Sequence, residues 1–160
     1  MTGLFGLIDG AVRQYTDELI AEGVRVNVIG RLHEAPSDVQ RSIRAAEERT
    51  GGGTQLTLNI CFNYSGRAEL VDAIRAIAAA AIPPGEIDEA HVAEHLYTAG
   101  QPDVDLLIRT GGDQRTSNFL IWQATYAELV FCPKFWPDFS PDDFDAALAD
   151  YARRERRFGA

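Results

Sequence analysis

Short apolar runs alternate with longer segments of helical spacing along most of the chain. Runs that are β-branched or alternate in polarity predict strands, and apolar residues spaced three and four apart predict amphipathic helices. The predicted strands cover residues 24–29, 55–62 and 104–108, with another before Cys132, and the predicted helices cover residues 3–22, 36–49, 67–81, 88–97 and 141–156. Gly23 is expected to cap the first helix, and Ser37 and Ser140 are expected to cap the second and the last.

Strands that alternate with helices predict an α/β fold, with a mostly parallel sheet flanked by helices and with binding loops at the carboxyl ends of the strands. The chain has 160 residues and is 46% hydrophobic, so it can bury one sizeable core, and a single domain over residues 1–160 is expected. Its net charge of −9 and the lack of a basic stripe argue against nucleic-acid binding. An anionic ligand therefore has to be held by local groups.

The cysteines and the first residues bear on the cellular compartment. Cys61 and Cys132 lack the spacing of metal ligands and are predicted to be reduced thiols. The first apolar residues have no basic leader of the kind found in signal peptides, and no apolar segment is long enough to span a bilayer. We therefore expect a cytoplasmic protein.

The most distinctive stretch joins the third predicted strand to a second apolar segment. Arg109 ends the strand, Gly111 and Gly112 follow, and Ser117 is expected to begin a helix. Glycines let backbone N–H groups approach a ligand, a helix N-terminus attracts anions, and the guanidinium forks of Arg109 and Arg115 suit phosphate. The stretch therefore predicts a diphosphate site. An ordinary strand-to-helix turn with surface arginines explains the same residues equally well.

The amino-acid sequence of this stretch also resembles that of a known protein family. IRTGGDQRTSNFLIWQ, followed by YAELVF and FWPDF, resembles the C-terminal signature of the cis-prenyltransferase family, which is undecaprenyl diphosphate synthase-like. Upstream, LNICFNYSGRAE resembles the family's L-N-I-x-x-N-Y-G-G-R segment, and RRERRFG resembles its closing Arg-x-Gly element. The resemblance covers nearly all of the chain, but only the later part of a family member.

The resemblance implies a transferase that condenses isopentenyl diphosphate with an allylic diphosphate in cis configuration, with Mg²⁺ as cofactor. It implies that Arg109, Arg115 and Ser117 bind isopentenyl diphosphate. Glu128 is implied to help coordinate Mg²⁺, in the chain's own site or in that of a partner subunit; alternatively it is a surface acid at a helix end. A homodimer, or a heteromer with a related subunit, is the implied assembly.

Both ends of the chain carry residues with implied roles. Arg157 and Gly159 resemble the Arg-x-Gly element that completes a neighbouring subunit's substrate site, although basic residues also suit a helix C-terminus. In the family the helix that corresponds to residues 3–22 lines the tunnel for the growing hydrocarbon. The candidate tunnel residues are Leu4, Leu7, Ile8 and Ala11. Ordinary core packing explains the same apolar stripe.

The chain departs from the family in what precedes its first helix. The family's D-G-N-x-R segment and its F-S-x-E-N-W loop are not found, so the catalytic aspartate has no counterpart and no catalytic residue is assigned. We expect an N-terminally truncated cis-prenyltransferase. Within the matching region, Ser65 stands where the family has Gly, and Asp113 where it usually has Glu. Asn63 and Arg67 either support the active site or fix the turn.

Two other functions remain open at this stage. The chain could be a non-catalytic partner subunit of a heteromeric cis-prenyltransferase. It could also be a zinc hydrolase, because residues 91–95, from His91 to His95, match H-x-x-E-H, a motif of some zinc hydrolases. Such an enzyme also needs a third metal ligand and a cleft. The lipid product of a prenyltransferase makes transient membrane contact plausible without a basic amphipathic helix that would require it.

Overall fold

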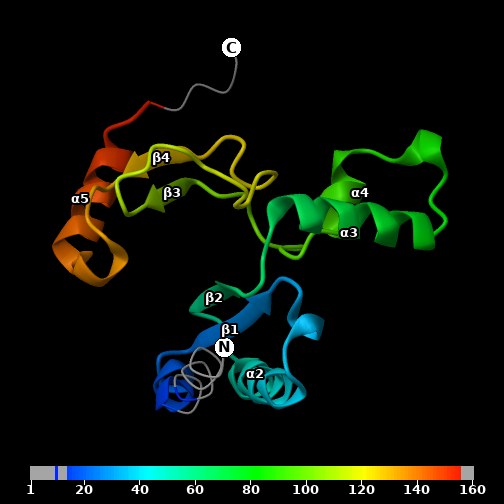
Figure 1. The fold of residues 1–160 in the computed structure, drawn as a ribbon, viewed down its shortest axis with the longest axis horizontal. Coiled ribbons are helices and arrows are strands. Elements are labelled where there is room, and N and C mark those ends of the chain that lie inside the picture. Colours follow the sequence, from blue (N-terminus) through cyan, green and yellow to red (C-terminus); the bar gives the residue numbers. More distant parts are fainter. Residues whose placement is uncertain (1–9, 11–13, 156–160) are drawn as a thin grey trace. The chain divides into compact units, whose positions relative to one another are not determined.

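A computed structural model describes residue 10 and residues 14–155 of the chain. The chain divides into two compact units, Met1–Ala99 and Gly100–Ala160, which we describe separately as the first and the second unit. Each unit contains a parallel pair of strands together with helices, which confirms the predicted α/β class (Figure 1). That residues 1–160 form a single domain stays a prediction.

The first unit is built on strands β1 and β2. Its elements are β1 (Val24–Ile29), η1 (Leu32–Glu34), α2 (Ser37–Thr50), β2 (Leu56–Cys61), α3 (Gly66–Ala79), η2 (Pro84–Glu86) and α4 (Glu89–Glu94), and residues 14–21 are helical. These confirm the predicted strands and helices, except that α4 is shorter than predicted and that the helix predicted at residues 3–22 is confirmed only in its described part, residue 10 and residues 14–21. Pro36, and not Ser37, is the N-cap of α2. The unexpected Ser65 caps α3, because its side chain accepts a hydrogen bond from the Ala68 amide at 3.3 Å.

The edge of β1 that faces away from β2 is closed by side chains of α2. The Val26 amide donates to Thr50 Oγ1 at 3.1 Å, and the Val28 amide donates to Glu47 Oε1 at 2.7 Å. Two strand amides that would otherwise offer pairing sites to another chain are therefore satisfied. Along its other edge β1 pairs with β2 in register from Val24 to Ile29.

Apolar packing and one glycine fix α2 against the strands. Ala35, Val39 and Ile43 form a buried cluster, with Val28, Leu32 and Phe62 packed against it. Burying one such aliphatic side chain contributes about 1.5–3 kcal/mol. Gly30 follows β1 with a φ of +119°, and a Cβ there would lie 2.1 Å from the Phe62 carbonyl oxygen. Only glycine fits this crossing of the two chain segments.

A polar network joins α3 to the segments around it. Glu69, whose exposed fraction is 1%, accepts hydrogen bonds from the Tyr64 hydroxyl and, at 2.9 Å, from the Tyr97 amide. One turn further along α3, Asp72 accepts from the Tyr97 hydroxyl at 2.5 Å and from two nitrogens of Arg31, each at 3.0 Å. Two carboxylates on one helix face thus hold three loops.

The second unit contains β3 (Leu106–Arg109), β4 (Glu128–Phe131), η3 (Trp136–Asp138) and α5 (Pro141–Ala152). The predicted strand at 104–108 and the strand before Cys132 are confirmed, and they pair in parallel. Ser140 caps α5, as predicted, in a capping box with Asp143, but α5 ends at Ala152, before the end predicted at residue 156. The prediction of a helix that begins at Ser117 is wrong, because residues 117–126 form turns and a bend. Ser117 and Leu120 have φ values of +57° and +46°, which no right-handed helix accommodates.

Candidate functional site

The glycine loop follows β3 and lies against the segment that follows β4. The Gly111 amide donates to the Lys134 carbonyl at 2.7 Å, and the Gly112 amide donates to the Cys132 carbonyl at 3.1 Å. Both glycines have positive φ, +95° and +81°, while a Cβ at either would meet its nearest neighbour only at 3.9 Å. Backbone conformation, rather than space, is therefore what requires glycine here.

These bonds correct the expectation that the glycine amides approach a ligand. Both amides are already paired with carbonyl groups of the neighbouring loop, and no helix begins at Ser117. Neither the glycine amides nor a helix N-terminus at Ser117 is therefore available to bind an anion, although the sequence predicted both. Side chains have to supply it.

Those side chains converge on Arg109, the last residue of β3. Its guanidinium donates to Ser117 Oγ at 2.9 Å, to the Arg115 carbonyl oxygen, and to Asp113 Oδ2 at 3.0 Å. Arg115 donates to both carboxylate oxygens of Asp113, at 2.9 and 2.5 Å. Arg109, Asp113, Arg115 and Ser117 form what we call the arginine cluster. It holds two guanidinium groups against one carboxylate and so keeps an excess of positive charge.

A cavity of about 350 Å³ opens beside the arginine cluster. Its walls are formed by Leu107, Ile108, Arg109, Thr110, Thr116, Ser117 and Phe119. The guanidinium fork of Arg109 and the hydroxyl groups of two threonines and a serine are donors suited to phosphate oxygens. The structure thus brings together the three residues predicted to bind a diphosphate. Arg109 and Ser117 form part of the cavity wall, and Arg115 is linked to Arg109 through the carboxylate of Asp113.

Glu128 does not belong to this cluster. It is the first residue of β4 and pairs with Leu106, whereas Arg109 pairs with Phe131. The Leu106–Glu128 pair and the Arg109–Phe131 pair are three residues apart along the strands, which is about 10 Å. Glu128 and Arg109 therefore lie at opposite ends of the strand pair. It is also not a helix-end acid. Its carboxylate accepts a hydrogen bond from Arg154 Nη1 at 2.7 Å.

Metal ligation by this chain alone is limited. Among the described residues, no group of three or more His, Cys, Asp or Glu side chains is placed to hold a metal ion. His91 Nδ1 pairs with Asp88 Oδ1 and His95 Nδ1 with the His91 carbonyl oxygen, each at 2.7 Å. The H-x-x-E-H motif therefore has no third ligand within this part of the structure, and nothing supports the zinc hydrolase alternative. Glu128 offers a single carboxylate.

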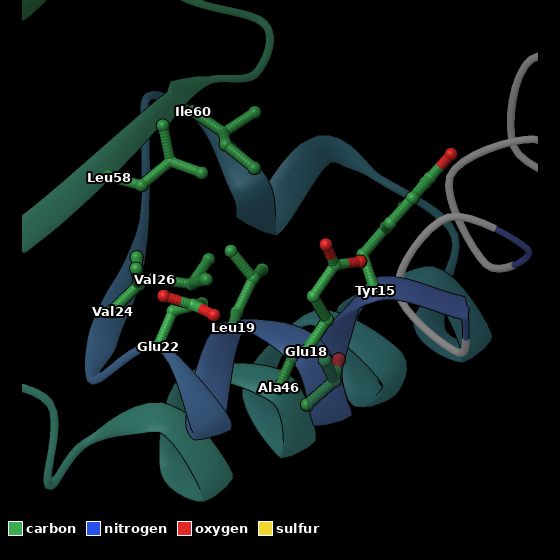
Figure 2. A pocket seen from close by; sticks show the side chains of 10 residues that line it. Tyr15, Glu18, Leu19, Glu22, Val24, Val26, Ala46, Leu58 and Ile60 are labelled. Atoms are coloured by element: carbon green, nitrogen blue, oxygen red, sulfur yellow. The ribbon is translucent and has the colours of Figure 1, made fainter.

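A second cavity, of about 490 Å³ and almost entirely apolar, lies in the first unit. Figure 2 shows side chains from helical residues 14–21, α2 and both strands directed toward it. It is lined by Tyr15, Thr16, Glu18, Leu19, Glu22, Val24, Val26, Ala46, Leu58 and Ile60. The predicted tunnel residues Leu4, Leu7, Ile8 and Ala11 lie outside the described residues, as do Arg157 and Gly159.

With the geometry established, comparison with known proteins decides the family. The family model described as "Putative undecaprenyl diphosphate synthase" matches residues 1–159. The chain belongs to the undecaprenyl diphosphate synthase family. No helix within the described residues is both long enough and apolar enough to cross a membrane.

Individual relatives within the undecaprenyl diphosphate synthase family agree. An isoprenyl transferase from Brucella suis biovar 1 is 45% identical over 99% of this chain and 64% of its own length. A trans,polycis-polyprenyl diphosphate synthase, (2Z,6E)-farnesyl diphosphate specific, from Thermobifida fusca is 46% identical over 98% of this chain and 57% of its own length. The chain therefore spans less than two thirds of these curated relatives.

A solved structure gives the same fold. Lavandulyl diphosphate synthase from Lavandula x intermedia, crystallised in complex with dimethylallyl diphosphate, matches with a TM-score of 0.93 and 35% identity. The match covers 98% of this chain and 70% of that protein. It confirms the predicted cis-prenyltransferase-like fold.

Two features of the site were missed or undervalued in the sequence. Asp113 is spaced to reach both arginines, four residues from Arg109 and two from Arg115, and this spacing was the available signal. The strand positions that line the apolar cavity, Val24, Val26, Leu58 and Ile60, were visible as every second residue of two predicted strands.

Proposed function

We propose that the chain supplies the isopentenyl diphosphate site and part of the hydrocarbon tunnel of a cis-prenyltransferase. The observation that carries this proposal is the convergence of Arg109, Arg115 and Ser117 on one network beside a 350 Å³ cavity. Membership of the undecaprenyl diphosphate synthase family supports the same reaction. Arg109 and Arg115 bind the diphosphate group, and Ser117 donates to it or holds Arg109.

In the proposed reaction the carbon–oxygen bond of an allylic diphosphate breaks while its carbon bonds to the double bond of isopentenyl diphosphate. The diphosphate leaves with the bonding electron pair, and the condensed product then loses a proton. The arginine cluster holds the isopentenyl group in place through its diphosphate, which contributes orientation rather than bond cleavage. Allylic diphosphates are also named for the Thermobifida relative and for the lavender structure.

The apolar cavity of the first unit is the proposed tunnel wall. Its lining comes from residues 15–22, from α2 and from strands β1 and β2. The predicted tunnel residues Leu4, Leu7, Ile8 and Ala11 precede this lining in the sequence. Transfer of a hydrocarbon chain from water to such a surface is favourable by about 25 cal/mol for each Å² of apolar surface that is buried. We propose that the described cavity continues the tunnel wall that those residues begin.

Glu128 is the proposed Mg²⁺ ligand. Mg²⁺ is commonly held by one or two carboxylates plus substrate phosphates, so a single carboxylate fits this donor set. Bound Mg²⁺ would neutralise diphosphate charge. Because Glu128 and Arg109 lie at opposite ends of the strand pair, we propose that Glu128 serves a site shared with a partner subunit.

The assembly and location follow from the same proposal. A homodimer, or a heteromer with a related subunit, lets Arg157 and Gly159 reach a neighbouring substrate site. We propose a cytoplasmic enzyme that contacts membranes transiently when its lipid product leaves.

Binding of isopentenyl diphosphate, measured by calorimetry, tests the central proposal without requiring turnover. Arg109→Ala removes the guanidinium at the centre of the cluster, and the loss of charge-assisted hydrogen bonds should weaken binding at least tenfold. Arg153→Ala is the matched control, because Arg153 lies in the same unit, is 74% exposed and donates to Asp150. Equal affinity in wild type and Arg109→Ala, with both folded, would contradict the proposal.

A further inference from the structure

Arg154 lies between two carboxylates, one from β4 and one from α5. Its Nη1 donates to Glu128 Oε2 at 2.7 Å, while Nε and Nη2 donate to Asp150 Oδ2 at 3.1 and 2.5 Å. All three guanidinium nitrogens are therefore used. The guanidinium ties the start of the strand to the end of the helix.

This arrangement conflicts with a free metal ligand at Glu128. A divalent cation that coordinates the carboxylate needs the oxygen that Arg154 holds, or must sit beside a guanidinium of the same sign of charge. The two cannot occupy the carboxylate together without repulsion between like charges. In the described structure the Glu128 carboxylate is bound by Arg154.

The pair is also exposed enough to exchange. The exposed fractions are 32% for the Arg154 side chain, 26% for Glu128 and 40% for Asp150. Water reaches all three groups, so a guanidinium that leaves Glu128 can be solvated and stays paired with Asp150. Two of the three guanidinium nitrogens of Arg154 donate to Asp150, and only one donates to Glu128, so the contact with Asp150 can remain when the one with Glu128 is lost.

We propose that Arg154 and a divalent cation compete for the carboxylate of Glu128, so that Arg154 keeps the metal position closed until the cation displaces it. Metal binding therefore loosens the contact between the end of α5 and β4. The inference rests on the proposed role of Glu128 as a metal ligand.

Mn²⁺ binding to the full chain, followed by the electron paramagnetic resonance signal of free Mn²⁺, tests the competition. Arg154→Gln removes the competing charge and should raise Mn²⁺ affinity about three- to fivefold, the effect expected for loss of a partly exposed ion pair. Arg153→Gln is the matched control and should leave the affinity unchanged, because its guanidinium donates to Asp150 and not to Glu128. Combining Glu128→Gln with Arg154→Gln should abolish the gain.

An affinity in Arg154→Gln that is equal to or below wild type overturns the proposal, as does a gain that persists in the double variant. Arg154→Met, which keeps the apolar stem, replaces Arg154→Gln if the latter does not fold. On wild type, the Arg154 Nε resonance should move when Mg²⁺ is added and stay in place with Na⁺ at equal ionic strength. No movement with Mg²⁺ also overturns the proposal. These measurements contain no isopentenyl diphosphate, so they fail independently of the isopentenyl diphosphate site.

Discussion

The network around Glu69 in the first unit and the arginine cluster in the second unit each contain a carboxylate that accepts several hydrogen bonds, but the two carboxylates differ greatly in burial. Glu69 is 1% exposed, whereas Asp113 and Arg115 have exposed side-chain fractions of 46% and 62%. A buried carboxylate has to be satisfied by protein donors, because water cannot reach it. An exposed ion pair can exchange its partner for a ligand. The first network therefore maintains structure, and the second is available for binding.

The largest effect is expected from Glu69→Ala. It leaves the Tyr64 hydroxyl and the Tyr97 amide without their acceptor, and the free energy of unfolding should fall by about 3 kcal/mol. Urea titration followed by circular dichroism measures this. Tryptophan fluorescence reports on the other unit, because Trp122 and Trp136 both lie there.

Glu69→Gln is the matched variant, since it keeps the shape and one acceptor oxygen. It should lose clearly less stability than Glu69→Ala. A loss below about 0.5 kcal/mol in the alanine variant, typical of surface substitutions, would place Glu69 with the exposed ion pairs and remove the contrast between the two networks.

A smaller effect is expected from titration of Tyr97. Burial, followed by the hydrogen bond to Asp72, raises the pKa of Tyr97 to about 12 from its ordinary 10.0. The folded state thus favours the protonated phenol, and its contribution to stability is complete below pH 10 and declines as the pH rises toward 12. The stability difference between wild type and Tyr97→Phe should shrink by about 2 kcal/mol from pH 9 to pH 11.5.

Urea titrations of both proteins at the two pH values measure that change, and Tyr126→Phe serves as control because Tyr126 is 71% exposed. A difference that stays constant between wild type and Tyr97→Phe would mean that the phenol titrates as in the unfolded chain. The Asp72 side of the network would then be as exchangeable as the arginine cluster.

The same contrast explains how far sequence alone could go. Strand β3 and helix α5 follow from local signals, namely an apolar run and a Ser140 cap with Asp143 three residues on. The buried Glu69 network depends on Tyr97, 28 residues away, and no local pattern specifies such a contact. The helix predicted after Ser117 failed because positive φ at Ser117 and Leu120 reflects tertiary context, which overrides the helical spacing of the apolar residues.

At the arginine cluster, residue types predicted three of the four members but not their arrangement. Arg109, Arg115 and Ser117 were found from their chemistry and from resemblance to a family. The amides of Gly111 and Gly112 were assigned to a ligand, yet they bind carbonyl groups of the loop after β4. A glycine pair indicates unusual backbone geometry, but the partners of its amides depend on which segment of the same chain lies beside it.

The smallest stability effect, and the sharpest test of exchangeability, is expected from Asp113→Asn. Asp113 occupies donors of both Arg109 and Arg115, so an incoming anion has to displace its carboxylate. Removing the charge should change the free energy of unfolding by less than about 0.5 kcal/mol, since the pairs are largely exposed. Affinity for inorganic pyrophosphate, measured by calorimetry, should rise a few-fold. A fall would show instead that Asp113 holds the two guanidinium groups in a binding geometry, so that the cluster, like the Glu69 network, is a fixed structure.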